Sequence, residues 1–315
     1  MPQKAPGKGE RNGISIIQLF QMFPDDQTAH DWLVEQRWGQ TGRSCPHCGG
    51  CHTTENKNNR FWCPDCRNRF SVKTGTAMEA SKISLQKWVI AIYLCATSLK
   101  SVSSMKLHRD LGITQKSAWF MMQRLREAWS QFSDDDFEGP VEADETYFGG
   151  KRKNMSNAKR KELRETQPGR GAVGKIAVVG VKDRETNRVR AKVVETTDAE
   201  TLQGFVEANT NESATVYTDE ARAYKGIARK HEAVCHSVHE YVRGMAHTNG
   251  MESFWSMLKR AHEGTFHKIS PKHLQRYVDE FAGRHNIRGM DTLDQMTTMF
   301  AGMVGKRLMY KQLTA

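Results

Sequence analysis

Two closely spaced pairs of cysteines are the feature that most constrains how this chain folds. Cys45 and Cys48 form one C-x2-C unit, Cys63 and Cys66 form a second, and fourteen residues separate the two units. Each unit lets two thiolates reach one ion, so together they predict a closed tetrahedral site for a structural Zn²⁺. Four thiolates leave no position for water, so this zinc is expected to stabilise the fold and not to catalyse a reaction.

The rest of the chain favours metal ligation over disulfide formation for these cysteines. Residues 1–12 are polar and basic with no apolar stretch behind them, unlike a conventional secretory signal. No run of about 18 apolar residues occurs, so no membrane-spanning helix is expected. We therefore expect a soluble, cytoplasmic protein with reduced thiols. Cys51, after Gly49-Gly50, is interpreted as a free neighbour of the zinc site, with a substitute ligand as the alternative.

The chain carries a positive charge that is concentrated in one segment. Lysine and arginine total 47 against 36 aspartate and glutamate residues, a formal net charge of +11. Such an excess favours a polyanionic partner through counterion release. Residues 151–170 hold eight basic and two acidic side chains, over half of the excess. We interpret this segment as a solvated loop that contacts DNA; the residues chosen for that role are Lys151, Arg152, Lys153, Arg160 and Lys161.

Changes in composition and periodicity divide the chain into four segments. Residues 14–40 predict two short helices separated by a Pro-Asp-Asp break, and residues 41–80 predict a small metal-stapled unit. Residues 81–133 are helical throughout, and residues 138–312 switch to a βα pattern. Strands are predicted there at 140–148, 175–182, 188–194, 214–218 and near 233–236. Helices are predicted at 199–209 and 249–261 and in the tail, 271–312.

The helical segment 81–133 contains a possible DNA-reading element. Its three helices are predicted at 84–97, 101–111 and 114–131. Gly112 followed by the cap Thr114 resembles the elbow of a helix-turn-helix, with an ordinary helical corner as the alternative. The basic residues that the following helix would present to DNA are Lys116, Arg124 and Arg126.

Acidic residues stand at the ends of elements in segment 138–312. Glu142, Asp144 and Glu145 lie on strand 140–148, and Asp219 directly follows strand 214–218. Glu252 lies on helix 249–261 seven residues before Lys259, so the two side chains share one helix face. Acids beside a core are costly unless they bind something. Carboxylates are preferred ligands of Mg²⁺, and two such ions can activate the attacking oxygen and stabilise the leaving oxygen in phosphoryl transfer.

With these residues in view, the sequence resembles the zinc-ribbon DDE transposases of bacterial insertion sequences, the group related to eukaryotic Merlin elements. The resemblance runs over nearly the whole chain. The motifs that carry it are CPHC…WCPDC…RFSVKTGT in the ribbon, then VEADETYFGGK, VYTDE and HTNGMESFWSMLKR with GTFH behind it. It implies a multidomain α+β protein with an N-terminal zinc ribbon, a helix-turn-helix segment and a C-terminal RNase H-like domain with a mixed five-stranded sheet.

The same resemblance implies the site and its chemistry. Asp144, Asp219 and Glu252 would hold two Mg²⁺ or Mn²⁺ ions, Lys259 would contact phosphate, and Asn249, one turn before Glu252, is the alternative third ligand. The implied reaction is cleavage of a strand at the element end, which frees a 3′-OH that attacks target DNA. The implied partners are double-stranded DNA, at terminal inverted repeats and target sites, and further copies of the chain in an oligomer on the bacterial nucleoid.

Two other functions are kept as alternatives. One is a DNA-binding regulator with an inactive catalytic remnant, and the other is a structure-specific nuclease of the same fold without strand transfer. A second zinc site is a weaker idea, because the order and spacing of its candidate ligands fit no standard closed site. Those residues are His231, Cys235, His236 and His239, which we interpret as strand and loop residues near DNA.

Overall fold

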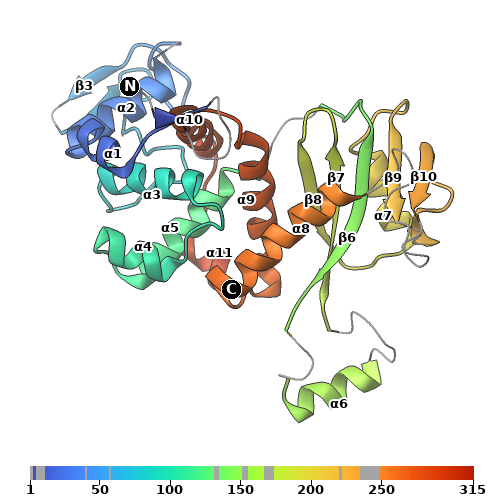
Figure 1. Ribbon diagram of the computed structural model, residues 1–315. Coiled ribbons are helices and arrows are strands. Elements are labelled where there is room, and N and C mark those ends of the chain that lie inside the picture. The colour runs from blue at the N-terminus through green and yellow to red at the C-terminus, as the bar shows by residue number, and fades with distance from the viewer. Residues whose placement is uncertain are drawn as a thin grey trace. The chain divides into compact units, whose positions relative to one another are not determined.

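Two units that are interleaved along the sequence make up the structure, a computed structural model (Figure 1). It describes residues 3–4, 11–39, 41–56, 58–130, 135–150, 155–166, 174–219, 222–234 and 248–315. Unit 1 comprises residues 1–132 and 287–315, and unit 2 comprises residues 133–286. Among the described residues, no helix is both long and apolar enough to cross a membrane.

Unit 1 is mainly helical, and polar caps begin its N-terminal helices. The caps are Ser15, Asp25, Ser84, Ser103 and Thr114, and each side chain accepts a hydrogen bond from a backbone N–H in the first turn. These helices are α1 (Ile16–Met22), α2 (Asp26–Trp38), α3 (Leu85–Thr97), α4 (Ser104–Leu111) and α5 (Gln115–Glu127). The last three begin within three residues of the predicted positions.

The cysteine-bearing segment forms a small antiparallel sheet. Its strands are β3 (Thr54–Asn56), β4 (Arg60–Cys63) and β5 (Asn68–Phe70), and β1 (Gln3–Lys4) pairs separately with β2 (Asn12–Gly13). The rings of Trp38, Phe61 and Phe70 pack together with centroids 5.3 to 6.1 Å apart. They belong to one buried apolar cluster that also includes residues of α1 to α5. The segments 14–40, 41–80 and 81–133 therefore share one core.

Helix α10 (Thr292–Met303) also belongs to unit 1, although it lies near the end of the chain. Met296, Met299, Phe300 and Met303 are buried in the same apolar cluster, and the helix contacts α2, α3 and α5. The short helix α11 (Tyr310–Thr314) follows it. The sequence predicts a catalytic segment that extends to residue 312, whereas residues 287–315 complete unit 1. Nothing in the helical periodicity of the tail indicates which core it joins.

The turn between α4 and α5 depends on one glycine. Gly112 has φ +58° and ψ +42°, the left-handed conformation that side chains with a Cβ rarely adopt. Its N–H donates to the carbonyl of His108, which closes α4, and Thr114 then caps α5. The two helices pack against each other as the sequence predicts for a tight helical elbow.

Unit 2 is built on a mixed five-stranded sheet, as the sequence analysis expected. Its strands lie in the order β10-β9-β6-β7-β8. Strand β6 runs parallel to β9 and antiparallel to β7, while β9 and β10 are parallel and β7 and β8 antiparallel. Their bounds are β6 (Val141–Phe148), β7 (Ile176–Asp183), β8 (Val189–Val194), β9 (Thr215–Asp219) and β10 (Lys230–Val234).

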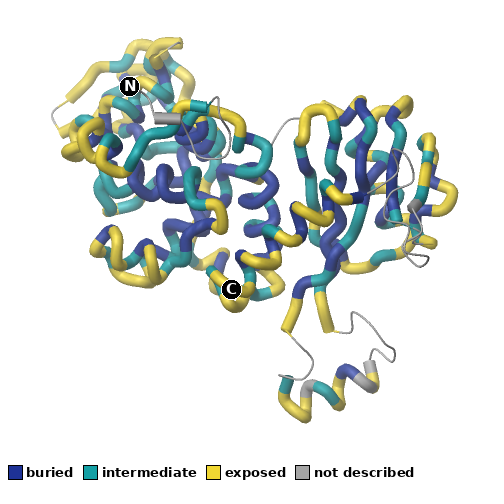
Figure 2. The backbone as a smooth tube through the Cα atoms, in the orientation of Figure 1, coloured by how far each residue is buried: buried dark blue, intermediate teal, exposed yellow. Residues whose placement is uncertain are grey.

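Helices cover both faces of this sheet, because alternate residues of its central strands point to opposite sides. On one face, α7 (Ala199–Glu207) packs Leu202 and Val206 on Val141, Ala143 and Val179. On the other, α8 (Asn249–Ala261) and α9 (Leu274–Ile287) pack on Phe148, Val178 and Val189. Figure 2 shows the buried strands between these layers. Short helical turns are η2 (Arg222–Tyr224), η4 (His262–Phe266) and η5 (Pro271–His273).

Between β6 and β7 the structure contains a helix that the sequence analysis did not predict. Helix α6 (Asn157–Thr166) lies within the basic segment that was interpreted as a loop. Its buried residue, Leu163, lies against Gly174, where a Cβ would come within 2.8 Å of the leucine side chain. With Ala158 and Leu163 as its only apolar residues, this segment shows no helical period, so the loop interpretation was wrong for these residues.

Candidate functional site

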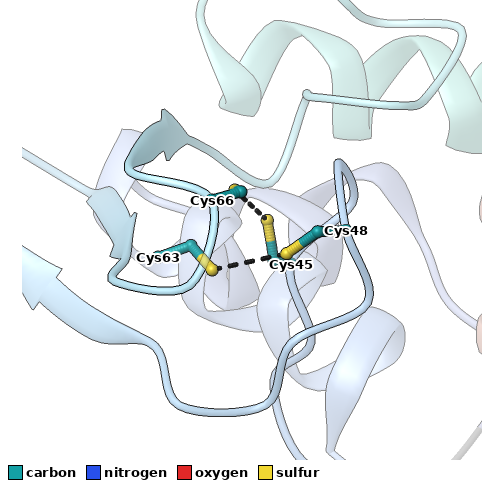
Figure 3. Close-up of side chains that lie close together, drawn as sticks. All are labelled: Cys45, Cys48, Cys63 and Cys66. Atoms are coloured by element: carbon teal, nitrogen blue, oxygen red, sulfur yellow. Dashed lines mark hydrogen bonds between the residues drawn. The ribbon is translucent and has the colours of Figure 1, made fainter.

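The four cysteines of the two C-x2-C units come together in the ribbon of unit 1 (Figure 3). Their sulfur atoms all lie within 4.8 Å of one another, with Cys45 and Cys66 3.7 Å apart and Cys48 and Cys63 3.6 Å apart. Four sulfurs about 2.3 Å from a central zinc ion would lie about 3.8 Å apart. The donor set and its dimensions therefore fit a tetrahedral structural zinc ion.

Backbone turns explain why these cysteines converge. Gly49 has φ +78° and Arg67 has φ +55°, so each C-x2-C unit is followed by a left-handed residue that turns the chain. A Cβ on Gly50 would come within 2.1 Å of the Asp65 carboxylate and 3.4 Å of the Cys48 sulfur, so glycine lets the second knuckle approach the first. Cys51 is exposed and lies outside the group of four.

The first two predicted catalytic carboxylates lie on adjacent parallel strands of unit 2. Strand β6 pairs with β9 in a register that sets Glu142 opposite Tyr217. Two residues further along each strand stand Asp144 and Asp219, both half-buried. Side chains separated by two residues share one face of a strand, so these two carboxylates are brought to the same face and the same level of the sheet.

Helix α8 brings the third predicted carboxylate to this region. The helix packs on β6 and β7 through Met251, Phe254 and Trp255, while Glu252 and Lys259 are exposed. At about 100° per residue, Glu252 and Lys259 lie about 20° apart around the helix axis. Asn249 is rotated about 60° from Glu252, in the direction away from the face of α8 that packs on the sheet. The Thr248 hydroxyl donates to the Glu252 carboxylate over 3.4 Å.

Negative charge accumulates at Asp144. Burial, together with the charges of Glu145, Asp219 and Glu252, raises the pKa of Asp144 to about 7. The opposing hydrogen bond from the backbone is too weak to restore the ordinary value. A carboxyl group whose ionisation is disfavoured in this way gains free energy from a bound cation, because the cation offsets the repulsion from its neighbours. The donor chemistry therefore fits divalent metal ions with a preference for oxygen ligands.

These carboxylates are in electrostatic range of one another without forming a compact group. Within the described ranges, the four cysteines are the one set of three or more His, Cys, Asp or Glu residues that meets the metal-site geometry. Asp144, Asp219 and Glu252 do not meet in that way around a single point. Their convergence closely enough to share two ions remains a prediction.

Comparison with known proteins identifies the family of this chain. Residues 136–286 match the ISXO2-like transposase domain. A protein of the transposable element ISH50 of Halobacterium salinarum is 30% identical over 281 residues, which cover 84% of this chain and 92% of the relative. The chain belongs to the DDE transposases of insertion sequences. The matched domain begins and ends close to the bounds of unit 2, so the family signature coincides with the unit that carries the acidic residues.

Two further acids on β6 of the transposase have structural partners. Glu142 is 2% exposed; it accepts from Arg184 Nε at 2.9 Å and from the backbone N–H of Met251 at 2.9 Å. It thus satisfies an N–H in the first turn of α8, where Thr248 makes no side-chain cap. Glu145 accepts from the Tyr224 hydroxyl at 3.0 Å. Burial and the charge of Asp219 raise the pKa of Glu145, against the effect of that hydrogen bond.

The predicted DNA-contacting residues of unit 1 differ in exposure. Lys116 is exposed on the first turn of α5, with its ammonium 4.6 Å from the ring centroid of Tyr310. Arg124 and Arg126 are only 8% and 2% exposed, so the expectation that both lie on a DNA-facing surface is not supported. They were chosen for their charge, but α5 is buried at every residue from 121 to 126, and Arg124 lines a pocket with Ser81 and Trp88.

The remaining residues predicted to contact DNA lie in the basic segment 151–170 of the transposase. Lys161 is exposed and Arg160 is half-buried, with its Nε donating to the Met155 carbonyl at 3.0 Å. Lys151, Arg152 and Lys153 lie outside the described residues, as do Cys235, His236 and His239. His231 lies on β10, where its Nε2 is 2.8 Å from the Thr218 hydroxyl.

Sequence reasoning missed two residues beside Asp144. Trp255 donates its indole N–H to Asp144 Oδ2 at 3.1 Å, and Gly180 lies directly opposite Asp144 on β7. A glycine inside the otherwise apolar strand was a usable signal, since such a glycine often marks a close approach of another element. The tryptophan gave no comparable signal, because an aromatic residue in an amphipathic helix is ordinarily core.

Proposed function

We propose that this transposase cuts DNA strands at the ends of its element and joins the freed 3′-OH to target DNA. The observation that carries this proposal is the position of Asp144 and Asp219, each two residues beyond the Glu142–Tyr217 pair on adjacent parallel strands. The charge of Glu252 on helix α8 acts on Asp144, whose pKa is raised to about 7. Repulsion among these neighbouring carboxylates costs stability unless a cation offsets it. An RNase H-like fold for unit 2 is part of the proposal, supported by the strand order.

Each residue has a proposed role. Asp144, Asp219 and Glu252 would hold two Mg²⁺ or Mn²⁺ ions, which supply activation of the attacking oxygen and stabilisation of the leaving oxygen when bound. Glu252 is preferred over Asn249 because it lies closer to the packed face of α8 and its charge acts on Asp144. Lys259, two turns further along the exposed side, would bind a phosphate of the DNA.

DNA binding is proposed for exposed basic residues of both units. Lys116 on α5 would contact the element end, in keeping with a helix-turn-helix reading of α4 and α5. Lys161 on α6, with the neighbouring basic residues, would bind the phosphate backbone. Coordinated cutting of two ends would require more than one copy of the chain. A structural zinc ion in the cysteine site would hold the ribbon.

A cleavage and joining assay tests the proposal. The inverted repeats that flank the gene give the end sequence for an oligonucleotide, which is incubated with supercoiled plasmid and Mg²⁺. Wild-type protein is expected to nick the oligonucleotide and join it to the plasmid, whereas Asp144→Ala, Asp219→Ala and Glu252→Ala lose both steps. Asn249→Ala is the matched control and is expected to retain them.

Each alternative function gives a different result in this assay. A DNA-binding regulator would bind the end without cutting, and a nuclease would cut without joining. Full activity in Asp219→Ala would refute the enzyme assignment. Loss of activity in Asn249→Ala with full activity in Glu252→Ala would transfer the third role to Asn249.

A further inference from the structure

One hydrogen bond joins helix α8 directly to the first candidate carboxylate. The indole N–H of Trp255 donates to Asp144 Oδ2 at 3.1 Å, and Trp255 itself is only 3% exposed. A buried indole N–H needs an acceptor, and here the acceptor is the carboxylate with the raised pKa. The bond fixes one oxygen of Asp144 and thereby sets the direction of the other.

A notch in the sheet holds the tryptophan in place. Gly180 on β7 pairs with Asp144 on β6. A Cβ on Gly180 would lie 2.5 Å from the Met251 methyl carbon and 2.8 Å from two ring atoms of Trp255. A side chain at this position would therefore displace the Trp255 ring that lies beside Asp144.

A second contact fixes the register of the helix along the strand. The Met251 N–H donates to Glu142 at 2.9 Å, so residues 251 and 255 of α8 bond to residues 142 and 144 of β6. Four residues of helix advance about 6 Å and two residues of strand advance about 6.8 Å, so the two contacts are matched in spacing. The same pair of contacts places Glu252, which lies between them on the helix.

We propose that Trp255 is a positioning residue that orients the Asp144 carboxylate for divalent-cation binding, with Gly180 as the notch that admits its ring. This inference rests on the proposed function, because it assumes that Asp144 is a metal ligand. Trp255 would touch neither DNA nor the ion. Groups that orient metal ligands in this way typically contribute about 10- to 100-fold to metal affinity.

Mn²⁺ binding provides a test that does not depend on catalysis. Free Mn²⁺ is measured by electron paramagnetic resonance during titration of the full-length protein, without DNA. Trp255→Phe keeps an aromatic ring but removes the N–H donor, and we expect it to weaken Mn²⁺ binding about 10-fold. Trp32→Phe, in unit 1, is the matched control and is expected to bind Mn²⁺ as the wild type does.

Cleavage kinetics separate positioning from a general structural role. In Trp255→Phe, the Mg²⁺ concentration for half-maximal rate is expected to rise about 10-fold, while kcat at saturating Mg²⁺ returns to near the wild-type value. A variant with a merely damaged fold would lose kcat at every Mg²⁺ concentration. That result, or an unchanged Mn²⁺ affinity, would overturn the inference.

The failure of this inference is distinguishable from failure of the proposed function. If Asp144→Ala and Asp219→Ala bind Mn²⁺ as the wild type does, the proposed function fails. If those two lose binding and Trp255→Phe does not, only the positioning role fails. Should Trp255→Phe not fold, the indole N–H resonances of the seven tryptophans give a second readout. One of them is expected to shift in Asp144→Ala, and the absence of any shift would refute the contact.

Discussion

Replacing Asp144 with asparagine is expected to stabilise unit 2 while abolishing catalysis. The pKa of Asp144 is about 7 against an ordinary value of 3.8, because burial and three neighbouring carboxylates disfavour its charge. The unfolded chain therefore releases this proton at lower pH than the folded protein does. Stability is lost as the pH rises from about 3.8 to about 7, and the full loss is present above that window.

The size of the effect follows from the pKa difference. At about 1.4 kcal/mol per pKa unit, ionising Asp144 in the folded state costs at most about 4 kcal/mol. Screening by solvent and salt and relaxation of the neighbouring side chains reduce this to on the order of 1–2 kcal/mol. For a unit of this size, that corresponds to an increase of about 3–6 °C in the melting temperature of Asp144→Asn at pH 8.

Scanning calorimetry of the full chain at pH 8 and pH 5 measures this difference. The buffer contains neither added divalent cations nor chelators, because a chelator would also remove zinc from the cysteine site. Asp183→Asn is the matched control; Asp183 is buried but accepts from the Glu185 N–H and the Thr186 hydroxyl, so its loss is expected to destabilise. If Asp144→Asn melts no higher than wild type at pH 8, or if its advantage does not shrink at pH 5, the electrostatic account is refuted.

Three further predictions concern the zinc site, DNA binding and the helical elbow. Cys63→Ser is expected to lose bound zinc by elemental analysis, whereas Cys51→Ser keeps it; equal zinc in both would contradict the four-cysteine assignment. Lys161→Ala is expected to lower the slope of log affinity for duplex DNA against log salt by about 1, while Arg126→Met leaves the slope unchanged and lowers stability. Gly112→Ala is expected to cost about 1 kcal/mol in urea unfolding, because its φ is +58°.

The sequence predicted those features that depend on local periodicity. Helix α8 has the predicted bounds, because its apolar residues recur at helical spacing over thirteen positions. The central strands β6 and β7 are within one residue of their predicted ends. Valine and isoleucine make up much of β7, and β6 begins with Val141 and ends in Thr146, Tyr147 and Phe148, all residues that favour a strand. The convergence of the cysteines was equally predictable, since the ligand spacing of a zinc knuckle is local.

Features set by long-range packing were not predictable in this way. Arg126 carries a charge that normally indicates a surface, yet it is 2% exposed in a helix that packs against both α4 and α10. The contact of Trp255 with Asp144 joins residues 111 positions apart, and only the register of α8 on β6 brings them together. In both cases the packing that determines where the side chain lies involves residues distant in sequence.

The interruption of unit 1 by unit 2 has a consequence for synthesis. A ribosome must translate all of residues 133–286 before it reaches α10, whose Met296, Met299 and Phe300 fill the core around the cysteine-bearing half. Unit 2 is one continuous segment and can fold as it leaves the ribosome. Unit 1 can complete its core only after residues 287–315 have been translated. A premature stop codon just beyond residue 286 would thus leave unit 2 complete but remove α10 from the core of unit 1.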